Sequence, residues 1–249
     1  MTSSHRTAFL DRVSQALGTD PVSFSARRTA LFARPPAQAL TPRSVPAQEA
    51  LLEKLAHQAI PLNLHVTPVA DPADAARHIA ALVRDRRPEW GIQKSVIRWA
   101  DPLLDALDLE SALADQQVPV STTAMDPAAD PARQRQAIRE RTIAAFMGVT
   151  TADYCLAETA TLVLRSRPHQ GRAVSLVPAI HAAVIPMDRI LADLSELFAL
   201  LGQDACAPHS GLTRHMVLIS GPSKTADIEL TMVHGAHGPR ELHIFVVRS

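Results

Sequence analysis

Hydroxyl and cationic side chains follow an apolar run near the end of this 249-residue chain. The run at residues 215–220 reads HMVLIS, which is typical of a strand, and it breaks at Gly221 and Pro222. Ile228, Met232 and Val233 then have helical spacing, so we expect a helix after the turn. Unpaired N–H groups and the dipole at a helix start favour a phosphate or carboxylate. The candidate ligand-binding residues are Ser220, Gly221, Ser223, Lys224, Thr225 and Asp227.

The same turn also has a simpler interpretation. Ser223 or Thr225 could be an ordinary N-cap, with Asp227 favoured in the first turn by the helix dipole. The segment is not a P-loop, because Ser223 precedes Lys224 and Leu218 occupies the upstream position where that motif needs glycine. The sequence therefore predicts either an anion-binding turn or a capped helix without a ligand.

Three histidines and one arginine could join this turn. We expect His181, in an apolar run, and His234 and His237, in a glycine-rich turn, to face one pocket. His234 and His237 have a plausible metal-ligand spacing, but no third ligand is fixed by the sequence, so we predict no metal site. Arg240 could bind a carboxylate through two parallel hydrogen bonds, or form an ion pair with a neighbour such as Glu241.

The elements that must position these residues alternate between helix and strand patterns. Helices are expected at residues 47–60, 71–87, 101–109, 132–147 and 188–201, and strands at 62–66, 95–99, 118–121, 161–164, 173–177, 181–185 and 242–247. This alternation predicts an α/β fold with a mostly parallel central sheet and helices on both faces.

The first part of the chain has a different character. Residues 4–17 have an amphipathic helical pattern, and residues 19–46 are rich in proline. We expect residues 1–46 to form an arm and residues 47–249 to form the α/β domain. The arm is either a solvated linker or a segment that packs on a second subunit, which would make the protein a homo-oligomer.

Composition and charge exclude several classes of protein. Lysine plus arginine and aspartate plus glutamate number 25 each, so net charge gives no reason to expect nucleic acid or a membrane surface as partner. Two cysteines are too few for a four-cysteine iron–sulfur or zinc site within the chain. With neither a secretion signal nor a long apolar run, we expect a cytoplasmic protein.

Three blocks of sequence resemble the LUD-domain proteins, specifically their lactate-utilisation protein C branch. They read GVTTAD at 148–153 with AETATLVL at 157–164, RAVSLVPAIHAAVIP at 172–186, and ISGPSKTADIE at 219–229 with GAHGPRELH at 235–243. The resemblance extends from about residue 62 onward. It implies a fold similar to the superfamily of ribose-phosphate isomerase, glucosamine-phosphate deaminase and CoA-transferase. It also implies a role in oxidising L-lactate to pyruvate beside two partner proteins that carry iron–sulfur centres.

The resemblance also directs attention to residues 157–160. Glu158 is the candidate catalytic carboxylate, because its placement looks similar to that of the glutamate nucleophile of CoA-transferases. Its alternative role is that of a buried glutamate that accepts hydrogen bonds from backbone amides. Ala160 stands where the family pattern leads us to expect glycine. If that glycine permits a close ligand approach or a positive φ, the alanine weakens the assignment of a site here.

Three functional hypotheses are compatible with the sequence. The chain could be a non-redox subunit of a lactate-oxidising complex, with an anion-binding pocket, no cofactor of its own, and iron–sulfur clusters on its partners. It could instead be a stand-alone enzyme acting on a phosphorylated or CoA-linked small molecule. The third hypothesis is a ligand-binding regulatory module that docks a partner through the arm.

Overall fold

The computed structural model describes residues 12, 13, 15, 16, 43–88, 93–204, 215–226, 232–234 and 238–248. The chain divides into two compact units, Met1–Thr41 and Pro42–Ser249, and the described strands all belong to the second unit. Most of the expected arm lies outside the described residues. Within the expected helix at 4–17, the described residues are helical.

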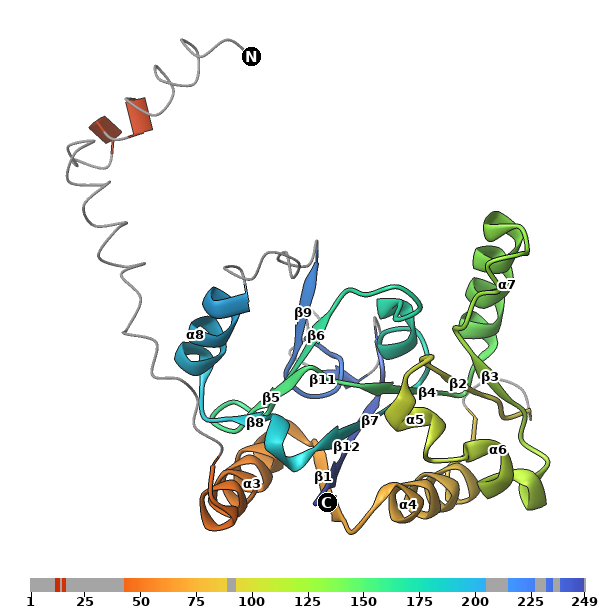
Figure 1. Cartoon of the computed structure of the whole chain (residues 1–249), viewed down its shortest axis with the longest axis horizontal. Coiled ribbons are helices and arrows are strands. Elements are labelled where there is room, and N and C mark those ends of the chain that lie inside the picture. The colour runs from red at the N-terminus through yellow and green to blue at the C-terminus, as the bar shows by residue number, and fades with distance from the viewer. Residues whose placement is uncertain are drawn as a thin grey trace. The chain divides into compact units, whose positions relative to one another are not determined.

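A six-stranded parallel sheet forms the centre of the second unit, in the order β1-β12-β7-β4-β2-β3 (Figure 1). Its strands are β1 His65–Val69, β2 Val96–Arg98, β3 Val120–Thr122, β4 Met147–Thr151, β7 Ile180–Pro186 and β12 Glu241–Val247. The three central strands are buried along nearly their whole length, as expected for a sheet covered on both faces. This confirms the α/β prediction and the parallel sheet.

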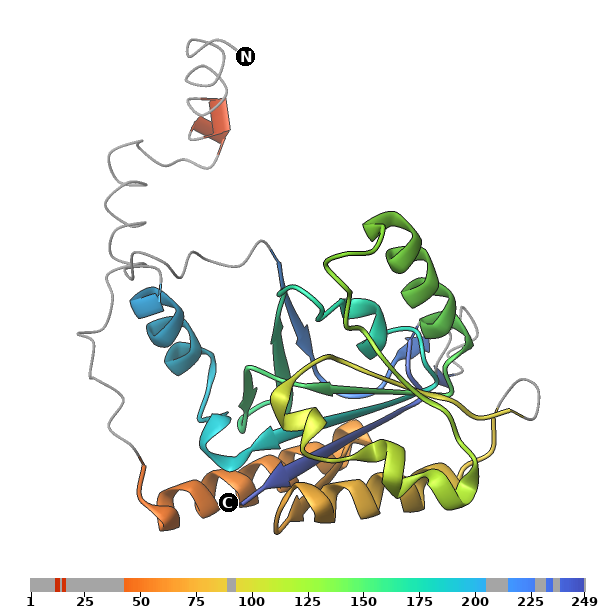
Figure 2. The same ribbon diagram turned by 45° about the vertical axis from the view of Figure 1, so that its right-hand side comes forward.

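The described α-helices of this unit are α3 Val45–Ala59, α4 Pro72–Asp85, α5 Pro102–Asp105, α6 Leu109–Ala112, α7 Pro131–Ala144 and α8 Leu194–Asp204. Helices α3 and α4 lie against one face of the sheet (Figure 2). Helix α4 begins as predicted, because Asp71 caps it by accepting a 2.7 Å hydrogen bond from Asp74 N. Helix α7 stands away from the sheet in both views.

A second, four-stranded sheet covers the opposite face, in the order β8-β5-β6-β9. Its strands are β5 Tyr154–Leu156, β6 Thr161–Arg165, β8 Ile190–Leu191 and β9 Met216–Ile219. Helix α8 packs on this sheet through a small apolar cluster that includes Leu197 and Leu201. The sequence predicted a single sheet, so this second layer is a finding of the structure.

The helix predicted after Gly221 and Pro222 is wrong. The chain forms an antiparallel hairpin instead, with β10 Lys224–Ala226 paired to β11 Met232–His234. Two adjacent apolar residues, Met232 and Val233, suit a strand as well as a helix, and pairing with the facing segment decides between them. The N–H groups of a helix start are therefore not available at Lys224 and Thr225 to hold an anion.

Other boundaries also differ from prediction. The helix expected at 101–109 forms two short helices, α5 and α6, and the strand expected at 62–66 begins only at His65. The strand expected at 173–177 is a short 3₁₀ helix, η3 Arg172–Ser175. The helix expected at 188–201 is preceded by a 3₁₀ turn, η4 Met187–Arg189, and by β8, and starts only at Leu194. Met147 begins β4 rather than ending a helix. Each error falls on a short apolar run, where periodicity alone does not separate helix from strand.

Candidate functional site

A cavity of about 290 Å³ opens between the parallel sheet and the chain segment that follows β9. We call it the His181 cavity. Its lining comprises Ser175, Leu176, His181, residues 217–223, Gly238, Pro239 and Leu242. His181 and Leu242 face each other in register on β7 and β12, so they share the face of the sheet that bears the second layer.

His181 is the buried polar group of this cavity, with only 1% of its surface exposed. Its Nε2 lies 2.8 Å from Thr150 Oγ1 on the neighbouring strand β4. Its Nδ1 has no hydrogen-bond partner in the described part of the chain. Burial, with a smaller effect from the nearby His243, lowers the pKa of His181 to about 3. The imidazole is therefore neutral at physiological pH, and Nδ1 can donate to or accept from a ligand according to the tautomer.

A glycine and two hydrogen bonds determine the conformation of the turn after β9. Gly221 has φ of 88°, and a Cβ there would lie 3.3 Å from Leu62, so glycine suits both the conformation and the space. Ser220 Oγ is 2.7 Å from Thr161 Oγ1 on β6. Ser223 N donates to Pro239 O at 2.8 Å. These contacts fix one wall of the His181 cavity.

The structure brings together four of the predicted site residues: His181, Ser220, Gly221 and Ser223 all line this cavity. Lys224 is exposed at the start of β10. Thr225 and His234 lie on the hairpin strands, and their side chains are not described. Asp227 and His237 lie outside the described residues.

Two other predicted residues are not among the described lining residues of the His181 cavity. Arg240 is exposed, and its backbone N donates to Ala179 O at 2.8 Å. Glu158 is exposed in the turn between β5 and β6, where its backbone N donates to Ala192 O at 3.1 Å. The alternative role of Glu158 as a buried glutamate is therefore wrong.

Ala160 closes the same turn with a positive φ of 46°, although it is fully buried. An L-residue in this region carries a strain of about 1–2 kcal/mol, which glycine would avoid. The position where the family pattern leads us to expect glycine therefore does have a positive φ, and alanine adopts it here at a cost in strain.

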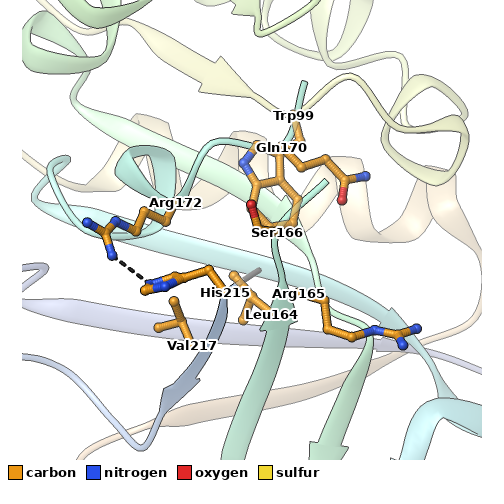
Figure 3. A pocket seen from close by; sticks show the side chains of 8 residues that line it. All are labelled: Trp99, Leu164, Arg165, Ser166, Gln170, Arg172, His215 and Val217. Atoms are coloured by element: carbon orange, nitrogen blue, oxygen red, sulfur yellow. Dashed lines mark hydrogen bonds between the residues drawn. The ribbon is translucent and has the colours of Figure 1, made fainter. Parts of the chain in front are cut away.

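A second cavity, of about 340 Å³, lies where β2, β6 and β9 come together (Figure 3). We call it the Trp99 cavity. Its lining residues are Trp99, Leu164, Arg165, Ser166, Gln170, Arg172, His215 and Val217. Sequence reasoning missed this cavity, because its lining residues come from four separate segments that only the folded chain brings together.

A buried carboxylate lies beside the Trp99 cavity. Asp153, 4% exposed, accepts hydrogen bonds from Arg165 N at 2.7 Å and from Arg165 Nε at 3.0 Å. It also accepts one from Arg167. Asp153 thus forms ion pairs with both Arg165 and Arg167.

Neither a metal-ligand group nor a reactive cysteine is found among the described residues. No group of three or more His, Cys, Asp or Glu side chains is placed to hold a metal ion among them. Cys155 is fully buried, and this burial raises the pKa of its thiol to about 12. Cys206 lies outside the described residues. None of the described helices is long and apolar enough to cross a bilayer.

Comparison with known proteins places the chain in a family. The LUD domain model matches residues 52–247. The chain belongs to the LUD-domain family. This LUD protein is 30% identical to the "Lactate utilization protein C" of Geobacillus kaustophilus, with 98% of the chain and 96% of the relative covered.

Other relatives of the LUD protein match over shorter spans. It is 36% identical to the protein of that name from Halalkalibacterium halodurans, over 63% of the chain and 64% of the relative. For the relative from an Exiguobacterium species the identity is 38%, over 47% of the chain and 50% of the relative. The match therefore spans about half to two thirds of these two relatives. A solved structure of a DUF162 family protein from Deinococcus radiodurans is 20% identical, with a TM-score of 0.49 over 80% of this chain and 98% of that one.

Proposed function

We propose that this LUD protein takes part in lactate utilisation, as a non-redox subunit of a complex that oxidises L-lactate to pyruvate. The names of its relatives support the lactate role. Two cysteines, one of them buried with a raised pKa, support the assignment of the iron–sulfur clusters to partner proteins.

The His181 cavity is the proposed ligand site of this subunit. The observation that carries the proposal is the buried Nδ1 of His181 in the wall of a cavity, which finds no partner among the described residues. A buried polar atom without a partner costs about 1–3 kcal/mol, and a ligand that supplies the hydrogen bond recovers it.

The rest of the lining defines the class of ligand. Ser220 and Ser223 present hydroxyl groups, and the described lining carries no ionised side chain; the exposed Lys224 follows directly in the chain. A small hydroxy or oxo acid fits this chemistry. Its hydroxyl or carbonyl would meet His181, and its carboxylate would meet the serine hydroxyls near Lys224.

Growth on L-lactate tests the lactate role. The gene is deleted in the organism that encodes it, and the strain is complemented with wild type, His181→Gln or His78→Gln. His78 is an exposed histidine on α4 and provides the matched control. We expect deletion to abolish growth on L-lactate but not on glucose, and His78→Gln to restore it fully. Normal growth of the deletion strain on L-lactate would reject the role.

Binding to purified protein tests the site separately. Thermal shift is measured with L-lactate, pyruvate, inorganic phosphate, a sugar phosphate and CoA. We expect L-lactate or pyruvate to raise the melting temperature of wild type and His78→Gln but not of His181→Gln. Stabilisation only by the sugar phosphate or CoA would favour the stand-alone enzyme. Equal stabilisation of all three proteins would remove His181 from the site.

A further inference from the structure

The order of the parallel strands reverses beside the Trp99 cavity. From β2 the sheet continues to β3 on one side, whereas β4, β7 and β12 follow one another on the other side. In open parallel sheets, ligands bind outside the carboxyl ends of the strands at such a reversal. Trp99 directly follows β2, and Asp153 closely follows β4. The Trp99 cavity thus occupies the position where the topology favours a ligand.

Hydrogen bonds fix the inner wall of this cavity. Trp99, only 2% exposed, donates from Nε1 to Gly171 O at 2.9 Å. Gln170 donates from Nε2 to Asp101 Oδ2 at 3.0 Å, and Thr151 Oγ1 donates to the same oxygen at 3.3 Å. The wall is therefore ordered without a ligand, which lowers the entropic cost of binding one.

The outer end of the cavity is cationic. Arg172 donates from Nη1 to His215 Nε2 at 2.6 Å. A ring nitrogen that accepts a hydrogen bond has no proton of its own, so this partner leaves the charge of Arg172 uncompensated. Within the described residues, no carboxylate lies at ion-pair distance from Arg172. Figure 3 shows Arg172 and His215 together at one end of the cavity, with the Arg165 guanidinium at the other end.

We propose that the Trp99 cavity binds an organic acid with an apolar body. Its carboxylate meets the Arg172 guanidinium, whose planar fork suits two parallel hydrogen bonds. Its body packs on Leu164 and Val217, the two aliphatic side chains of the lining. This site adjoins the His181 cavity, since Val217 lines both, but Arg172 and His181 each line only one of them, and the proposal does not depend on the lactate role.

Calorimetric titration of the full chain at constant ionic strength tests the proposal with three probes. Benzoate carries both the carboxylate and an apolar body, acetate carries only the carboxylate, and benzamide is the neutral counterpart of benzoate. We expect benzoate to bind at least tenfold more tightly than acetate or benzamide. No binding of benzoate to wild type would overturn the proposal.

Variants locate the binding. Arg172→Gln should weaken benzoate binding roughly tenfold to a hundredfold, the loss expected for hydrogen bonds between charged groups. Arg172→Lys keeps the charge without the fork and should give an intermediate loss. Arg135→Gln, on the exposed helix α7, makes the same charge change elsewhere and should bind as wild type does.

Other outcomes separate a specific site from charge effects. Arg172 is exposed, so its variants should melt within a few degrees of wild type. Equal benzoate affinity in Arg172→Gln and wild type would overturn the proposal. Equal weakening in Arg172→Gln and Arg135→Gln would also overturn it, because net charge alone would then explain binding. Competition by L-lactate in wild type but not in His181→Gln would place benzoate in the His181 cavity instead.

Discussion

Gly148 offers the sharpest test of how closely η3 packs on the parallel sheet. It lies on the central strand β4, in register with Ile97 and His181. A Cβ at this position would be 1.9 Å from Val174 O, 3.0 Å from Val174 C and 3.1 Å from Pro178 Cγ. The closest obstacle is the backbone of η3, which cannot move aside as a flexible side chain would. Gly148→Ala therefore forces η3 away from the sheet.

The size of the effect follows from this geometry. A non-bonded contact of a carbon is optimal near about 3.5 Å, so η3 must shift by roughly 1.5 Å. Val174 is buried, and the Trp99 indole holds Gly171 O just before η3, so the shift disrupts packing. Overpacking costs typically 1–3 kcal/mol, and a backbone clash belongs at or above the upper end, about 3 kcal/mol. For a chain of this size the melting temperature should fall by about 6–12 °C.

Differential scanning calorimetry measures this fall, and Gly171→Ala provides the control. A Cβ at Gly171 meets nothing within 4 Å, and its φ of −67° suits alanine. This second variant should be neutral, or more stable by about 0.4–1 kcal/mol. If Gly148→Ala melts within 2 °C of wild type, the close approach of η3 to the sheet is wrong.

Three further predictions concern buried groups. Asp153→Asn removes the buried carboxylate that pairs with Arg165 and Arg167, so urea denaturation should show a loss of about 2–4 kcal/mol in the free energy of unfolding. Ala160→Gly relieves the strain of the positive φ but removes a buried methyl group worth about 0.8 kcal/mol. The same assay should therefore show an unchanged free energy of unfolding or a gain of up to about 1 kcal/mol. A clear loss would show that Ala160 is not strained. His181 has a folded pKa of about 3, below its unfolded value near 6.5, so its contribution to stability is complete above pH 6.5 and is lost as the pH falls toward 3. At pH 5.5 the loss should be about 1.4 kcal/mol, and His181→Gln should show a correspondingly flatter dependence of melting temperature on pH.

Locally determined features could be predicted from the sequence. Helix α4 begins where Asp71 and Pro72 indicate, because capping depends on residues only a few positions apart. The apolar run at residues 242–247 is indeed a strand, and Pro119 lies just before β3, a strand at the edge of the sheet, where proline is tolerated. The alternation of helix and strand was sufficient to predict the parallel sheet.

Features that depend on pairing between distant segments could not be predicted. The hairpin of β10 and β11 replaces the expected helix because its two strands satisfy each other's hydrogen bonds, which single-segment periodicity cannot reveal. The division of strands between two sheets has the same origin. Strand β6 pairs with β5 and β9 rather than joining the parallel sheet.

Residue types in the sequence predicted part of the candidate site, whereas its three-dimensional contacts could not be predicted. His181 and the serine-rich turn were identified from residue types, and they do line one cavity. The role of Thr150 as the partner of His181 was missed, because a threonine in a strand carries no distinctive signal. The Trp99 cavity was missed entirely, since only the folded sheet brings its segments together.

The pairing of β1 with β12 bears on how the protein is made. Among the described strands, β1 at residues 65–69 has β12, at residues 241–247, as its sole neighbour in the sheet. During translation β1 is synthesised long before the strand that must lie between it and β7. Until residues 241–247 leave the ribosome, one edge each of β1 and β7 stays open to strands of other chains. A nascent or truncated chain that ends before residue 241 should therefore depend on chaperones and aggregate readily.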